Sequence, residues 1–162
     1  MNRSAPNPID NATLVFPRLA GLYQQGEPLA YALLRICFGL IMVTHGLPKL
    51  LGTAHGSMAD PMAGSMRLIE TVLHLPFPAF FAMLVALLEG VGGVLVTLGL
   101  GTRLLAAAMA IQMAAISYIL GPTWPWIDRG IEYPVLMMFL CLYFSLRGAG
   151  PYSLDRRLKR EL

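Results

Sequence analysis

The sequence predicts an all-α membrane protein built as a bundle of four transmembrane helices. Of its 162 residues, 56% are hydrophobic and 13% are charged, whereas about a quarter of the residues in a soluble domain are charged. The apolar residues gather in blocks close to the roughly 20 residues that a helix needs to cross a bilayer. No segment alternates as a barrel strand would, and lipid cannot satisfy an open backbone, so each block is expected to be a helix.

Four spans are expected, at residues 29–47, 79–100, 104–120 and 127–146. The last apolar run covers only residues 133–146, about 21 Å of helix, so this span is expected to begin near Ile127. Residues 1–28 lack the apolar core of a cleaved signal peptide because Pro17 and Arg18 interrupt it. They form an N-terminal interfacial segment, and residues 148–162 form a basic interfacial tail.

Basic residues predict the orientation, since an even number of spans places both termini on one side. That side holds eight of them: Arg3, Arg18, Arg103, Arg147, Arg156, Arg157, Lys159 and Arg160. The opposite loops hold three: Lys49, Arg67 and Arg129. The positive-inside rule therefore makes both termini cytoplasmic, in a bacterial inner membrane.

Both ends of the bundle carry interfacial features. In the tail, Leu154, Leu158 and Leu162 recur every four residues among basic side chains, which favours a short helix along the inner headgroups. On the outer face, residues 62–74 are expected to form a surface helix. Trp124, Trp126 and Tyr133 suit an aromatic belt at the membrane boundary.

Two ionisable residues are predicted to meet inside the membrane. Arg35 lies about ten residues before the outer end of the first span, and Glu89 about ten residues after the outer start of the second. At 1.5 Å per residue both would be roughly 15 Å deep. Because a buried charge is costly alone, we expect the guanidinium and the carboxylate to pair.

A polar stripe follows one face of the first span. Arg35, Met42, His45 and Lys49 fall within an arc of about 80° at 100° per residue, and Glu132 and Tyr133 are expected at the depth of His45. The stripe predicts a pocket that opens outward, in which Arg35, Lys49, Glu132 and Tyr133 bind a ligand and Glu89 and His45 transfer protons. The alternative is that these charges only fix helix register.

Small residues predict close helix packing around this pocket. Ala82, Ala86, Gly90 and Gly93 recur through the second span, and Ala106, Ala107, Ala110 and Ala114 through the third.

The sequence offers less evidence for a metal site than for the polar pocket. Cys37 and Cys141 lie in apolar blocks without CxxC spacing and are expected to be unpaired apolar residues. In the first outer loop, His55, Met58, Met62 and Met66 form a weak candidate site for copper(I), which favours thioether ligands.

The sequence resembles the DoxX family of small bacterial membrane proteins. Matching motifs are an early arginine (Arg35) followed by His45-Gly46 and Lys49, then Glu89-Gly90-x-Gly92-Gly93 with Arg103, then Glu132-Tyr133-Pro134, and lastly Tyr152-Ser153-Leu154-Asp155. The resemblance implies a four-helix membrane bundle. It also implies redox work, since relatives are linked to thiosulfate oxidation with quinone and to membrane complexes handling oxidant stress.

The leading hypothesis is therefore a membrane component of a redox system whose pocket binds a quinone or a small anionic substrate. No paired cysteines or dinucleotide-binding loop are evident, so electrons would pass through a bound quinone or a partner redox protein. The alternatives are a non-catalytic subunit that docks an enzyme, a copper-binding protein and a transporter. Lipid and a second copy of the chain are expected partners, whereas scattered basic residues argue against nucleic acid.

Overall fold

The structure, a computed structural model, describes residues 14–159. The elements in chain order are η2 (Pro17–Leu19), α1 (Ala20–Leu51), α2 (Pro61–Thr71), α3 (Pro78–Leu98), α4 (Thr102–Leu120), η3 (Trp126–Asp128), α5 (Glu132–Arg147) and α6 (Leu154–Leu158). These residues form no β-strand beyond one isolated bridge, so the all-helical prediction is confirmed.

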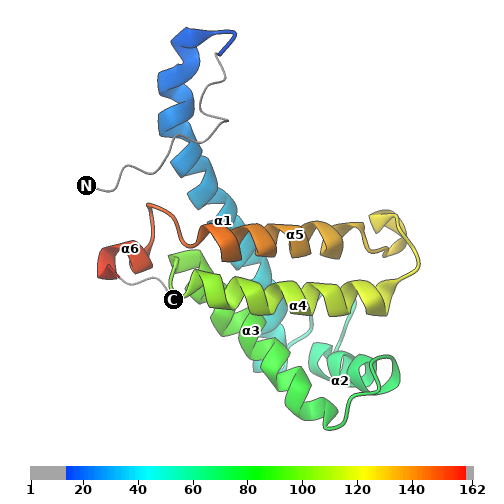
Figure 1. The fold of residues 1–162 in the computed structure, drawn as a ribbon. Coiled ribbons are helices and arrows are strands. Elements are labelled where there is room, and N and C mark those ends of the chain that lie inside the picture. Colours follow the sequence, from blue (N-terminus) through cyan, green and yellow to red (C-terminus); the bar gives the residue numbers. More distant parts are fainter. Residues whose placement is uncertain (1–13, 160–162) are drawn as a thin grey trace.

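The long helices form two antiparallel pairs. Helix α1 packs against α3, and α4 packs against α5, with the second pair running across the first (Figure 1). Helix α2 lies beside α3. The first turns of α1 extend beyond the other helices, and no atom lies within 4 Å of where a Cβ on Gly21 or Gly26 would be.

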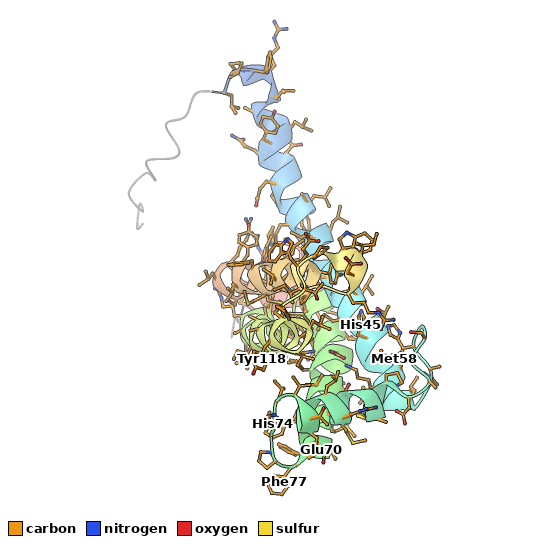
Figure 2. The ribbon with its side chains drawn as sticks, turned by 90° about the vertical axis from the view of Figure 1, so that its right-hand side faces the viewer. His45, Met58, Glu70, His74, Phe77 and Tyr118 are labelled. Atoms are coloured by element: carbon orange, nitrogen blue, oxygen red, sulfur yellow. The ribbon has the colours of Figure 1, made fainter. Side chains whose placement is uncertain are left out.

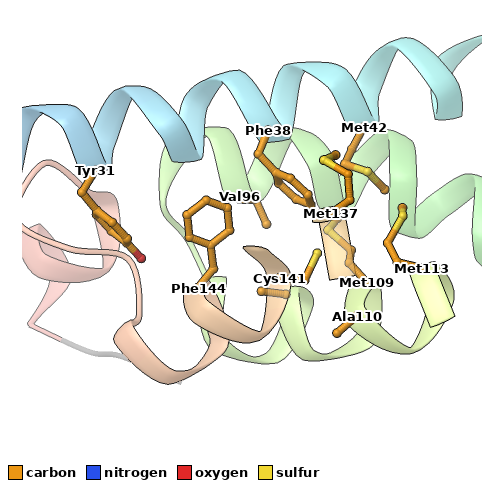
Figure 3. Close-up of a cluster of buried hydrophobic side chains, with 11 residues drawn as sticks. Tyr31, Phe38, Met42, Val96, Met109, Ala110, Met113, Met137, Cys141 and Phe144 are labelled. Atoms are coloured by element: carbon orange, nitrogen blue, oxygen red, sulfur yellow. The ribbon is translucent and has the colours of Figure 1, made fainter. Parts of the chain in front are cut away.

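The core fills the crossing between the two pairs (Figure 3). From α1, Phe38 and Met42 point toward α4 and α5, where they meet side chains that include Cys141 and Phe144. The rings of Phe38 and Phe144 contact edge to face, with centroids 5.4 Å apart. Three of the remaining core residues are methionines, whose flexible chains fill irregular gaps.

Within the described part of the chain, three helices are long and apolar enough to cross a membrane: the segment Pro17–Leu51, α3 and α4. Helix α5 has 16 residues, about 24 Å of helix, which is less than the roughly 30 Å of a hydrocarbon core. It begins at Glu132 and not near Ile127, because Trp126–Asp128 form a separate 3-10 turn that ends at Arg129 with φ of 60°. A fourth span and the cytoplasmic side of the termini stay predictions.

Other helix bounds also differ from those expected. Helix α1 starts at Ala20, nine residues before the expected span, and runs on to Leu51. Helix α2 starts at Pro61, where the carboxylate of Asp60 accepts from Ala63 N and caps the first turn, and it ends at Thr71. Helix α6 covers Leu154 and Leu158, whereas Leu162 and the first 13 residues lie outside the described part of the chain.

Candidate functional site

Glycines set the register between α1 and α3. A Cβ on Gly46 would lie 2.6 Å from the backbone carbonyl carbon of Glu89, and a Cβ on Gly93 would lie 2.9 Å from Gly39 O. Real side chains cannot come so close, so only glycine permits this backbone contact. The contact places the last turns of α1 level with the middle of α3.

This register brings Lys49, Glu89 and Gln112 together in a buried polar cluster. The Lys49 ammonium donates to Glu89 Oε2 at 2.5 Å, and Gln112 Nε2 of α4 donates to Glu89 Oε1 at 2.6 Å. The Glu89 side chain is 4% exposed and that of Lys49 is 12% exposed. Both oxygens of the carboxylate thus have a donor, which is the condition for keeping a charge away from water.

A cavity of about 430 Å³ adjoins this cluster. Its polar lining side chains include His45, Lys49, His55, Glu89, Gln112 and Tyr133. Its other walls are mainly apolar and come from α1, α2, α3, α4 and α5, among them Met42, Leu68, Val85, Ile116 and Met137. The cavity therefore has a polar region beside a largely hydrophobic body, a combination typical of small-molecule sites.

Histidines of α1 and the following loop meet at this cavity. The rings of His45 and His55 contact edge to face, with centroids 4.8 Å apart. Met58 also lines the cavity, and Figure 2 shows it beside the part of α1 that carries His45. Met62 and Met66 do not line the cavity, so the structure does not gather the four residues of the sequence-based copper site.

Arg35 does not pair with Glu89, and that prediction is wrong. Its guanidinium donates to the carbonyl oxygens of Ala149 and, at 2.6 Å, of Tyr152. A Cβ on Gly99 would lie 3.0 Å from Arg35 Cζ, so the arginine is level with the α3–α4 turn. The expected pair came from counting residues inward from the hydropathy boundaries of the two spans. That count failed because the glycine contacts place Arg35 beside Gly99, about ten residues further along α3 than Glu89.

The first two residues of α5, Glu132 and Tyr133, lie in different surroundings. Tyr133 lines the cavity, as expected. The Glu132 carboxylate instead accepts from Trp126 N at 2.9 Å and is not part of the cavity lining, so its expected place in the pocket is wrong. It satisfies the backbone of the loop that precedes α5.

Two further motif residues hold the opposite end of the bundle. Arg103 donates to the carbonyl oxygens of Ser145 and Arg147, which closes the carboxyl end of α5. Asp155 is buried and accepts from Gly101 N at 3.0 Å, while its own backbone N–H donates to Gly99 O. The Tyr-Ser-Leu-Asp motif therefore anchors the tail on the α3–α4 turn.

Sequence reasoning missed Gln112. Gln112 stands alone as an amide in an apolar span, and such residues usually bond across helices. That signal could have placed it in the site. Asp155 was singled out only as part of the Tyr-Ser-Leu-Asp motif, and its anchoring role could not be predicted, because an acidic residue in a charged tail resembles any solvated one.

Within residues 14–159, no group of three or more His, Cys, Asp or Glu side chains is arranged to hold a metal ion. Cys37 is exposed, Cys141 is buried, and neither forms a disulfide.

Comparisons with known proteins agree with a membrane protein of this class. The sequence model of the family described as DoxX matches residues 30–121. The "Uncharacterized membrane protein Rv3486" of Mycobacterium tuberculosis is 31% identical over 158 residues, 90% of each chain. The "Putative oxidoreductase CatD" of Bacillus subtilis is 28% identical over 123 residues, 76% of this chain and 82% of its own. No solved structure shows a significant match.

Proposed function

Because this chain belongs to the DoxX family, we propose that it is the membrane component of a redox system and that its cavity binds a quinone. The observation that carries the proposal is the mainly apolar cavity of about 430 Å³ with Lys49, Glu89 and Gln112 in its wall. Its size falls in the usual range for small-molecule pockets, roughly 300–1,000 Å³. The Bacillus subtilis relative bears the name "Putative oxidoreductase CatD", which supports a redox role.

The lining favours a quinone over a small anion. A quinone head group carries two carbonyl acceptors on an apolar ring, and the cavity offers apolar walls beside an ammonium group. Lys49 has three N–H donors, of which Glu89 takes one. Arg35 lies elsewhere and the charge of Lys49 is balanced by Glu89, so no lysine or arginine among the described lining residues is left unpaired for an anionic substrate.

Each polar residue has a role in this proposal. A quinone takes up two electrons and two protons when it becomes a quinol. Lys49 donates to a head-group oxygen and orients the ring. Glu89, held in place by Gln112, exchanges protons with Lys49, and the more exposed His45 carries protons between the cavity and solvent. Tyr133 forms part of the cavity wall.

We further propose the cellular setting from the charge pattern. With both termini in the cytoplasm of a bacterial inner membrane, the cavity opens toward the outer half of the bilayer. Electrons reach it from a partner redox protein that docks on the outer loops, and the exposed apolar sides of the helices contact lipid or a second copy of the chain.

The test is binding of a short-chain benzoquinone to the protein in nanodiscs, measured by equilibrium dialysis against empty nanodiscs. We expect saturable binding to the wild type that weakens about tenfold or more in Lys49→Met, since a charged hydrogen bond contributes about 1.5–3 kcal/mol. The matched control is Lys159→Met, which removes the exposed lysine of the tail. Equal binding in both variants, or none above empty nanodiscs, would refute the proposal.

Proton transfer has its own test. Glu89→Gln keeps the shape of the side chain but removes its acid–base group. In membrane vesicles that retain the partner redox protein as electron donor, we therefore expect it to abolish quinone reduction while the protein remains in the membrane. Glu70→Gln changes an exposed glutamate of α2 and should leave the rate unchanged. Full activity in Glu89→Gln would assign Glu89 to structure alone.

A further inference from the structure

Two histidines from consecutive segments, the end of α1 and the loop that follows it, lie together at the cavity. His45 belongs to the last turns of α1, and His55 belongs to the loop before α2, with ring centroids 4.8 Å apart. Neither imidazole has a hydrogen-bond partner within residues 14–159. Their ring nitrogens are therefore open to solvent or to a ligand.

Met58 reaches the same place from the loop. His55 and Met58 exchange both backbone hydrogen bonds, at 2.9 Å and 3.0 Å, as an isolated antiparallel bridge. Residues that face each other in such a pair extend their side chains to the same side. His45, His55 and Met58 all line the same cavity, so two imidazoles in ring contact and one thioether face a shared space.

We propose that His45, His55 and Met58 form a binding site for copper(I) at the exposed end of the cavity. The three ligands are neutral, and one of them is a soft thioether, a set that favours copper(I) over magnesium, calcium or manganese. The Lys49 ammonium is engaged by Glu89, so the nearest fixed positive charge is balanced. His45 and Met58 are exposed, which gives the ion a path from solvent.

This assignment changes the set of residues that the methionine spacing suggested. Met62 and Met66 lie on α2 and do not line the cavity, whereas His45, which the methionine spacing did not include, comes from the last turns of α1. The two methionines therefore serve as matched controls, since they share residue type and neighbourhood with Met58.

The experiment is an anaerobic titration of the purified protein in detergent micelles with copper(I), in competition with a chromophoric copper(I) chelator. We expect one ion per chain. Met58→Leu and His55→Ala should each weaken binding by about tenfold or more, since even outer-shell changes at metal sites cost roughly 10- to 100-fold. Met62→Leu and Met66→Leu should bind as the wild type does. X-ray absorption should show nitrogen and sulfur ligands.

Several results would overturn the site. One is the absence of stoichiometric copper(I) binding, and another is an unchanged copper(I) affinity in Met58→Leu. A third is zinc binding that is as strong as copper(I) binding and is not weakened in Met58→Leu. Because Met58 is exposed, its replacement should leave the fold intact. An unchanged elution volume in size-exclusion chromatography checks this for the variant. The titration contains no quinone, so its outcome does not depend on the proposed function.

Discussion

Removing Lys49 should destabilise the protein far more than removing any exposed charge. In Lys49→Met, the Glu89 carboxylate keeps Gln112 but loses its counter-ion while it remains 4% exposed. Breaking a buried ion pair from one side costs about 3–5 kcal/mol, because a charge is left without compensation. We expect a loss of stability in that range.

The double variant Lys49→Met, Glu89→Gln isolates the cause. It removes both charges and leaves an amide that can bond to Gln112, so most of the lost stability should return. Unfolding free energies in detergent, from SDS titration followed by circular dichroism, give the complete double-mutant cycle.

An exposed ion pair within the same chain provides the control. Glu27 pairs with Arg147, and the two side chains are 52% and 32% exposed. Glu27→Gln should cost about 0–1 kcal/mol, as solvent screens such a pair. Our reasoning fails if Lys49→Met costs no more than Glu27→Gln, or if the double variant is as unstable as the single one.

Three further predictions concern the framework of the site. Arg35→Met should release the segment that follows α5, seen as faster amide exchange there, while quinone binding stays at the wild-type level; weaker binding would return Arg35 to the cavity. Gly46→Ala should separate α1 from α3 and lower the melting temperature, whereas Gly26→Ala, which meets no neighbouring atom, should not; equal melting temperatures would contradict the close contact. Asp155→Ala should cost about 1–3 kcal/mol by leaving Gly101 N without its buried acceptor. Asp155→Asn should retain most of that stability, and matching losses in the two variants would point to another cause.

Much of the candidate site could be predicted from periodicity. Met42, His45 and Lys49 share one face of α1 because the helical repeat places them there, and all three line the cavity. Glu89 could be recognised as a site residue because an acidic side chain in an apolar span needs a partner. Its surrounding glycines and alanines also indicated a close helix contact.

The identity of that partner could not be predicted from the sequence. Arg35 and Lys49 lie on the same face of α1, and both can neutralise a carboxylate. Choosing between them requires the axial offset of α1 against α3, and hydropathy locates the ends of a span only to within several residues. Helix α1 made this harder because it runs well beyond its most apolar part at both ends.

By itself the sequence determined that this is a membrane protein of apolar helices with an acidic residue in one of them, because composition and helical period act locally along the chain. Only the tertiary structure decided that Lys49 and Gln112 hold Glu89, that Arg35 anchors the tail, and that His55 meets His45. Those outcomes depend on contacts between glycine backbones and on loop folding, which join residues that no local pattern relates.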